Sequence, residues 1–310
     1  MSGIKKIAIA GGTGTVGSHV IKALIETNFE VTVLTRSKQP TLDRSIANTI
    51  EVDYNSVESL TSALNGQDAV VSTVGTFGIA GQKTLIDAAI AAGVKRFIPS
   101  EFSSCSLHPD VQSLPFYSSL AAIRKHLIDS SENGALSYTI LGSGAFLDSI
   151  LTAPIMLNFD THSAVLVDGG NNRLSATSMA ATGKAIARIF LNVDETKNRI
   201  VRISEVILTQ STLIDIAKEV NPNQEWNTSI AKSTELVQQS LEAFAAGDAS
   251  FPTLLKLISG TVLAGDRYGA AYDMTDNDLL GISLMTREEL KKLVTERLNQ
   301  VPLNGASNTH

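Results

Sequence analysis

Short β-branched runs alternate with longer helical patterns through the first half of the chain. Segments such as TVGSHVIKALIET and SVESLTSALNG carry apolar residues at helical spacing and end near Gly or Asn. Strands separated by helices are joined by right-handed crossovers and form a parallel sheet. The sequence therefore predicts a doubly wound α/β domain over residues 1–145. Its expected strands cover residues 6–11, 30–36, 49–54, 69–75, 94–100 and 136–142.

The second half is less regular. Residues 164–178 have the pattern of a strand, a Gly-Asn turn and a second strand, and residues 198–205 form another expected strand. We expect a smaller, helix-rich lobe over residues 146–310, partly interleaved with the first domain, with a cleft between them and a frayed tail at residues 301–310. Its helices are expected at 179–192, 212–220, 233–248, 251–265 and 286–300.

Composition and charge exclude several classes of function. The net charge is −6 and the pI is near 5.4, so a broad basic surface for nucleic acid is not expected. The apolar run at the N-terminus is too short for a signal peptide, and no stretch approaches the roughly 18 apolar residues of a membrane helix. We therefore expect a cytoplasmic protein that does not bind a membrane. The single cysteine, Cys105, excludes an intrachain disulfide and carries no sign of an activating base.

A glycine-rich turn follows the first expected strand and opens the first helix. In AIAGGTGTVGSHV, Gly11 allows a tight turn, Gly14 lets the backbone approach a pyrophosphate, and Gly17 permits close helix–strand packing. The helix N-terminus then offers free N–H groups and a positive dipole end to phosphates. This context predicts dinucleotide binding, and the alternative is a purely structural turn.

The end of the second strand indicates which dinucleotide is bound. Arg36 stands where an acidic residue would hold a ribose 2′-hydroxyl and where an arginine holds a 2′-phosphate. Ser37 and Lys38 follow it, and no acidic side chain competes. The residues favour NADP(H), and the alternative is a solvated basic turn.

With these residues in hand, the chain resembles the NmrA-like, isoflavone-reductase-like branch of the atypical short-chain dehydrogenases. The resemblance rests on GGTGTVG, on Arg36, and on residues 56–75, 82–102 and 276–290, which include GVKRFIPSEF. It implies a Rossmann-type domain that binds NADP(H) and a C-terminal lobe that shapes a substrate pocket. Many members reduce hydrophobic secondary metabolites, whereas others bind the dinucleotide without turnover.

The resemblance also implies roles for individual residues. Some of them have a plain alternative, because Phe77 and Phe102 are also suited to a core, Glu101 to the surface, and the small residues of GSGAF (142–146) to packing alone. The implied cofactor-binding residues are Gly11, Thr13, Gly14, Thr15, Val16 and Gly17 at the pyrophosphate, Arg36, Ser37 and Lys38 at the 2′-phosphate, and Gly75, Thr76, Phe77, Ser100, Glu101, Phe102, Gly144 and Phe146 along the ribose and nicotinamide.

The chain departs from the resembled family at the proton donor. The family's reductases carry a lysine on the helix after PSEF, and Leu120 stands at that place, four residues before Arg124. Lys125 is a poor substitute, since it lies about 140° around the helix from position 120. Ser103 and Ala180 replace a usual glycine and a common aspartate. These changes indicate a remodelled site.

Two side chains are candidates for the missing proton donor. Tyr117 lies three residues before Leu120 on nearly the same helical face, and a phenol donates a proton when a neighbour lowers its pKa. His108 titrates in the useful range. The alternatives are a packed tyrosine ring and a solvated loop histidine.

The leading hypothesis is an NADPH-dependent reductase of a hydrophobic, aromatic or polyketide-like metabolite, protonated by Tyr117, His108 or water. One alternative is a cyclase or isomerase on the same fold, and another is a catalytically silent NADP(H)-sensing regulatory protein. We expect a small-molecule partner and no metal site, and a homodimer remains open. Further candidates to line the substrate pocket are Trp226, Tyr268 and Tyr272.

Overall fold

The computed structural model describes residues 3–37 and 48–300 and has a seven-stranded sheet at its centre. The strand order is β10-β6-β5-β4-β1-β2-β3, and every neighbouring pair is parallel. The order changes direction between β1 and β4, where an open parallel sheet forms a crevice beyond the carboxyl ends of its strands. This confirms the predicted doubly wound fold. The strands are β1 (Lys6–Ala10), β2 (Glu30–Thr35), β3 (Asn48–Glu51), β4 (Ala69–Ser72), β5 (Arg96–Ile98), β6 (Ser137–Gly142) and β10 (Arg199–Arg202).

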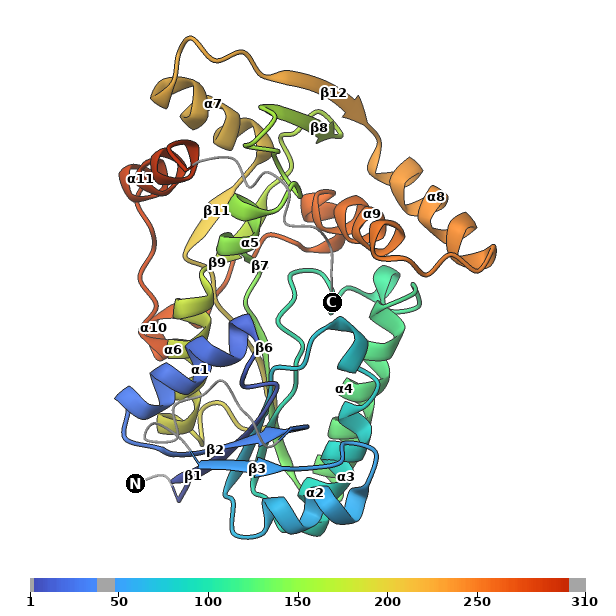
Figure 1. The fold of residues 1–310 in the computed structure, drawn as a ribbon, viewed down its shortest axis with the longest axis vertical. Helices are drawn as coiled ribbons and strands as arrows, with labels where there is room; N and C mark the ends of the chain where they lie inside the picture. Colours follow the sequence, from blue (N-terminus) through green and yellow to red (C-terminus); the bar gives the residue numbers. More distant parts are fainter. Residues whose placement is uncertain (1–2, 38–47, 301–310) are drawn as a thin grey trace.

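Helices cover both faces of this sheet (Figure 1). On one side lie α1 (Thr15–Glu26), α6 (Met179–Leu191) and α10 (Asn277–Leu280), and on the other lie α2 (Val57–Leu64), α3 (Gln82–Ala91) and α4 (Tyr117–Glu132). Alternation along β1 explains the two layers, because successive side chains of a strand point to opposite faces. Ile7 and Ile9 join the core under α1 and α6, and Ala8 and Ala10 join the core under α2 and α3.

The six strands expected in the first half are all present, and most end earlier than predicted. After β1 the chain turns at Gly11, whose φ of +77° is readily adopted only by glycine. The strand β5 ends at Ile98, because Pro99 has no backbone N–H to donate to a neighbouring strand. The residues beyond these strand ends therefore form loops above the sheet, where ligands of such folds bind.

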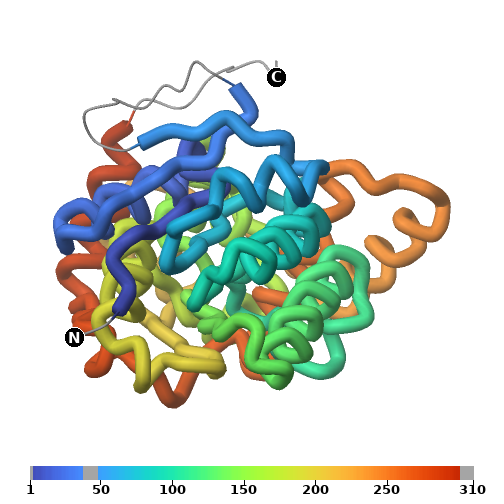
Figure 2. Tube along the Cα trace, turned by 90° about the horizontal axis from the view of Figure 1, so that it is seen from below, coloured from blue at the N-terminus to red at the C-terminus, as the bar shows by residue number. Residues whose placement is uncertain are grey.

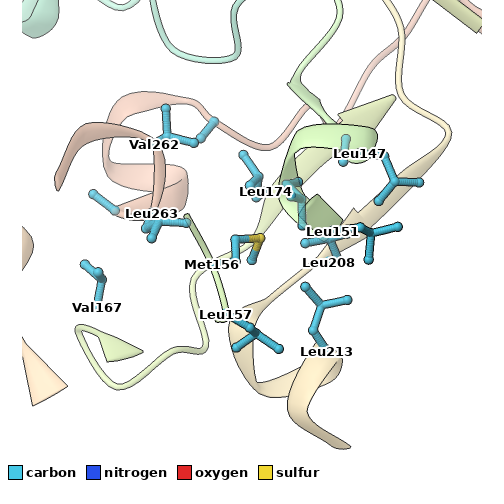
Figure 3. Packing of buried hydrophobic residues seen from close by; sticks show 14 of the residues in the cluster. Leu147, Leu151, Met156, Leu157, Val167, Leu174, Leu208, Leu213, Val262 and Leu263 are labelled. Carbon is cyan, nitrogen blue, oxygen red and sulfur yellow. The ribbon is translucent and has the colours of Figure 1, made fainter. Parts of the chain in front are cut away.

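The remaining elements form a lobe beyond the carboxyl ends of the strands (Figure 1). Its interior is a cluster of buried apolar side chains that includes Leu151, Met156, Leu174 and Leu263 (Figure 3). The lobe comprises β7 (Ala145–Phe146), α5 (Leu147–Thr152), β8 (Ser163–Val167), β9 (Leu174–Thr177), β11 (Val206–Leu208), α7 (Gln210–Val220), β12 (Asn227–Ala231), α8 (Ser233–Ala245), α9 (Phe251–Val262) and α11 (Arg287–Leu298).

The two strands expected within residues 164–178 are present as β8 and β9, but they belong to different sheets. The parallel partner of β8 is β12, whereas β9 pairs with β11 and β7. Asp168, Gly169 and Gly170 between them all have positive φ, so the chain turns sharply out of β8. The five helices expected in the second half are also present, as α6, α7, α8, α9 and α11.

Part of the second half of the chain returns to the central sheet. The strand β10 pairs with β6 at the edge of the sheet, and α6 packs along α1. Both views show α6 beside α1 (Figures 1 and 2). A side chain at Gly183 of α6 would place its Cβ 2.6 Å from the His19 carbonyl oxygen of α1, so the two helix backbones touch there. The sheet layer is thus built from both halves.

Two expectations lie outside the described residues, namely the role of Lys38 and the frayed tail at 301–310. Among the helices of the described ranges, none has the length and apolar character needed to cross a membrane.

Candidate cofactor and substrate site

The turn after β1 has room only for glycine at two positions. A Cβ on Gly11 would lie 2.6 Å from the Thr73 carbonyl oxygen, and a Cβ on Gly17 would lie 2.3 Å from the Gly11 carbonyl oxygen. Thr73 is itself fixed to β1, since its backbone N–H and its hydroxyl both donate to the Ala10 carbonyl, at 2.8 and 2.9 Å. The turn is therefore held against β4 and α1 by direct backbone contact.

The N-terminus of α1 is open toward the crevice. Its N-cap is Gly14, which offers no side-chain cap, and the first turn contains no acidic residue. Thr13, Gly14 and Thr15 are exposed. The first N–H groups of a helix lack partners within the helix, and its dipole favours an anion there. These residues fit a pyrophosphate, with Val16, which is half-buried, able to contribute through its backbone.

Arg36 lies exposed at the end of β2, in a turn closed by its neighbours. The Thr35 hydroxyl donates to the Ser37 carbonyl at 2.8 Å and accepts from the Ser37 N–H at 3.1 Å. Local turns of this kind hold the backbone in one conformation. Arg36 thus projects from a shaped turn beside the glycine-rich loop, which fits the 2′-phosphate of NADP(H).

Sequence reasoning missed Tyr54, which follows β3 and packs under this loop. Its hydroxyl donates to the Leu34 carbonyl of β2 at 3.0 Å. Burial raises the pKa of Tyr54 to about 12, although the Gly11 N–H and the Arg36 charge both act to lower it. Tyr54 is the last residue of the strand expected at 49–54, and a tyrosine at a strand end beside the crevice was the available signal.

At the end of β5, Ser100 is tied to its surroundings by two hydrogen bonds. Its N–H donates to the Gln82 side-chain oxygen at 2.7 Å, and its hydroxyl donates to the Val74 carbonyl at 2.8 Å. The Gln82 side chain is buried, and its Nε2 has no partner within the described residues. Gln82 was also missed, because glutamine in a first helical turn carries no distinctive sequence signal.

Glu101 is not a surface charge, as the alternative interpretation had it. Its carboxylate is buried in an ion pair with Arg124 of α4 and accepts a hydrogen bond from the Ser106 hydroxyl at 2.9 Å. Burial raises its pKa to about 7, although Arg124 and Ser106 act to lower it. The Glu101 side chain thus ties the loop after β5 to α4. Any contact between this residue and a cofactor would involve its backbone.

The loops after β5 and β6 meet above the sheet. The rings of Phe102 and Phe146 lie 6.4 Å apart between centroids, so two of the residues expected at the nicotinamide are brought together. Gly144 has φ of +68°, and a Cβ there would lie 2.3 Å from the Ser175 carbonyl oxygen. The hydroxyl of the buried Tyr272 lies 2.8 Å from the Ser103 carbonyl oxygen and 3.0 Å from the Ser104 carbonyl oxygen, so its single proton is shared between them. Tyr272 therefore supports the loop that contains Ser103.

A pocket of about 190 Å³ lies between the loop after β4, the start of α4 and the helices α8 and α9. None of its lining side chains is charged. Phe77 of the loop after β4 is 88% exposed and forms part of the pocket lining. The lining residues are Thr76, Phe77, Ile79, Ala80, Phe116, Ser119, Phe244, Ala249 and Leu254. Gly75, also expected near the cofactor, is exposed at the entrance to this loop.

Tyr117 lies outside this lining, inside the lobe core. It is only 1% exposed, and its hydroxyl lies 2.6 Å from the Thr261 hydroxyl of α9 and 3.5 Å from the Cys105 sulfur. Thr261 donates its own proton to the Leu257 or Ile258 carbonyl, so Tyr117 is the donor to Thr261. Burial raises the Tyr117 pKa well above its usual value. Proton donation would require a lowered pKa, and the buried position of Tyr117 agrees instead with the alternative of a packed tyrosine ring.

The other residues singled out in the sequence lie in different parts of the structure, and none of them lines the pocket. Leu120 is 2% exposed in the same core as Tyr117. His108 is half-buried, its ring lies edge-on to Tyr268 at 5.8 Å, and it is not among the residues that line the pocket. Cys105 is buried and its pKa is raised by that burial. Trp226 packs edge-on against Phe159 and His162 in the lobe. Ala180 is exposed in the first turn of α6.

Comparison with known proteins gives a consistent result. The NmrA-like family model matches residues 4–245. Oxidoreductase poxI of Penicillium oxalicum is 28% identical over 296 residues, which cover 92% of each chain. Oxidoreductase aprR of Aspergillus flavus is 29% identical over 290 residues, covering 92% of this chain and 97% of the relative. The solved structure of AtPrR2 with NADP+ and (+)pinoresinol superposes with a TM-score of 0.74 at 19% identity, over 95% of this chain and all of the other.

Proposed function

Because this chain belongs to the NmrA-like family, we propose that it is an NADPH-dependent reductase of an uncharged, hydrophobic aromatic or polyketide-like metabolite. The observation that carries the proposal is the uncapped N-terminus of α1 beside the exposed Arg36, a pair suited to a pyrophosphate and a 2′-phosphate. Relatives over nearly the full length are named oxidoreductases, and a neighbour in fold was solved with NADP+.

The pocket beside the loop after β4 supports the choice of ligand. Its lining combines aromatic rings with Thr76 and Ser119 and contains no charged side chain, so a charged ligand would lose hydration there without compensation. Its volume of about 190 Å³ is below the range of about 300–1,000 Å³ that is common for ligand pockets. The ligand is therefore small or extends out of the pocket, and the neighbour solved with (+)pinoresinol also binds an aromatic molecule.

The protein's own groups limit which reductions it can support. The nicotinamide, when bound, supplies the hydride. Leu120 carries no proton, Tyr117 is committed to Thr261, and His108 does not line the pocket, so we propose that water completes the reaction. Proton donation by a positioned side chain contributes typically 10²–10⁴-fold to a rate. An acceptor whose reduced anion is already stabilised, such as an extended enone or a quinone, depends least on that contribution.

A titration with NADPH and NADH tests the cofactor assignment. We expect tighter binding of NADPH, and we expect Arg36→Met to remove that preference because it keeps the aliphatic stem and loses the guanidinium. Lys22→Met, which removes an exposed cation from α1, is the matched control. Equal affinity of the wild-type protein for the two dinucleotides would refute the role of Arg36.

A panel of enones, quinones and lactones, with NADPH oxidation as the readout, then tests the reaction. One observation, the buried Leu120, favours a second candidate, which is a silent NADP(H)-sensing protein. Binding of NADPH without oxidation by any acceptor would select that candidate. Conversion of a ligand without any change in NADPH would select a cyclase or isomerase instead.

A further inference from the structure

Tyr54 joins two segments that the proposed cofactor site depends on. It lies three residues after β3, and its ring packs in the core cluster that includes Leu34 and Ala10. Its hydroxyl donates to the Leu34 carbonyl at 3.0 Å. Leu34 pairs with Ala10 in the sheet register and stands two residues before Arg36. The phenol therefore contacts the end of β2 at the point where the chain leaves the sheet toward Arg36.

The hydroxyl also faces the glycine-rich loop. The Leu34 carbonyl that accepts its hydrogen bond belongs to the residue paired with Ala10, directly before Gly11, and the Gly11 N–H and the Arg36 charge both act to lower the pKa of Tyr54. The turn itself is closed by the Thr35 hydroxyl through two hydrogen bonds to Ser37. Thr35 shapes the turn from within, whereas Tyr54 fixes the position of the strand end that carries it.

We propose that Tyr54 is a specificity-determining positioning residue, whose hydroxyl fixes the end of β2 against the glycine-rich loop so that Arg36 faces the 2′-phosphate of a bound dinucleotide. The inference rests on the proposed binding of NADP(H). Tyr54 does not itself carry the charge that recognises the 2′-phosphate. Loss of its hydroxyl should therefore weaken only the binding of ligands that have a 2′-phosphate, because the α1 N-terminus would hold the pyrophosphate without help from Tyr54.

Tyr54→Phe tests the inference, because it removes the hydroxyl and keeps the ring in the core. We expect the Kd for NADPH to rise about 5–10-fold, which is close to the effect of losing one hydrogen bond, because the lost bond displaces the Arg36 charge. The Kd for NADH should change less than about 2-fold. The same contrast is expected between 2′,5′-ADP and ADP. Tyr138→Phe is the matched control, since Tyr138 packs against the same core cluster from β6.

A double-mutant cycle separates positioning from general structure. In an Arg36→Met background, Tyr54→Phe is expected to leave the Kd for NADPH unchanged, since the residue it positions has lost its charge. An equal loss of affinity for both dinucleotides, or an unchanged Kd for NADPH in the single variant, would overturn the inference while leaving the proposed function intact. A wild-type protein that binds neither dinucleotide would overturn both.

Discussion

Replacing Tyr117 with phenylalanine separates a structural role for this residue from a chemical one. The change removes one hydroxyl from a position that is 1% exposed and breaks its 2.6 Å contact with Thr261. Thr261 still donates to the Leu257 or Ile258 carbonyl, and the buried donor that loses an acceptor is the weak Cys105 S–H, 3.5 Å from the Tyr117 hydroxyl. The free energy of unfolding should therefore fall by only about 1 kcal/mol, the net value of a typical hydrogen bond.

The expected readings are small for both stability and turnover. A loss of about 1 kcal/mol corresponds to a fall in Tm of about 1.5 °C, because the unfolding entropy is about 2.1 cal/mol/K per residue. NADPH oxidation with the best acceptor of the panel should change less than about 3-fold. Removal of a true proton donor would instead cost about 10²–10⁴-fold. Thermal denaturation and steady-state kinetics on the same preparation provide both numbers.

Thr261→Val is the matched variant for this test. It leaves the Tyr117 hydroxyl buried without its acceptor, so we expect a larger loss, about 1–3 kcal/mol, again with little effect on turnover. The reasoning is refuted if Tyr117→Phe lowers turnover 100-fold or more while the Tm stays within about 1 °C of the wild type. That outcome would mean that the hydroxyl reaches the ligand in the working protein.

Three further changes test other parts of the structure. Leu120→Lys should destabilise the protein by several kcal/mol in denaturant unfolding without raising turnover, because it places an ammonium group in the apolar core, whereas Leu120→Met should cost less than about 1.5 kcal/mol. Gly17→Ala should weaken NADPH binding at least about 10-fold, since its Cβ would meet the Gly11 carbonyl oxygen, and Gly81→Ala, which has ordinary contacts, should not. Glu101→Gln tests the buried pair with Arg124, and it should cost little near pH 5, where most of the folded wild-type protein also carries a neutral Glu101. Burial raises the folded pKa of Glu101 to about 7, so unfolding releases a proton between about pH 4.5 and 7. The free energy of unfolding of the wild-type protein should therefore fall as the pH rises through that window, and Glu101→Gln should lack this part of the fall. A stable, faster Leu120→Lys, full binding by Gly17→Ala, or an unchanged pH profile in Glu101→Gln would contradict these expectations.

The features that could be predicted are those that depend on residues close together in the sequence. The turn at Gly11 and Gly17 and the position of Arg36 follow from local backbone requirements, so they could be assigned without the fold. Tyr117 could not, because the hydroxyl that decides its environment belongs to Thr261, 144 residues away. The pairing of Glu101 with Arg124 has the same origin.

The strand β12 was missed for a different reason. Four of its five residues are exposed, so Asn227–Ala231 lacks the alternation of apolar and polar residues that marks a half-buried strand. It forms only because β8 supplies a partner edge. The pairing of β8 with β12, and of β9 with β11, joins segments whose association depends on the lobe core, and no local pattern specifies it.

The contact between Gly183 and His19 limits how proteins of this architecture can be divided or recombined. The helix α6 and the strand β10 come from the second half of the chain, yet α6 packs against α1 and β10 completes the edge of the sheet. A fragment cut after residue 145 would expose the apolar face formed by Ile7, Ile9 and Val20. The lobe is therefore made of segments inserted between elements of the sheet layer, before α6 and after β10. A chimera that exchanges ligand preference between relatives should graft residues 147–177 and the segments after 206 other than α10, and keep α6, β10 and α10 with their own α1.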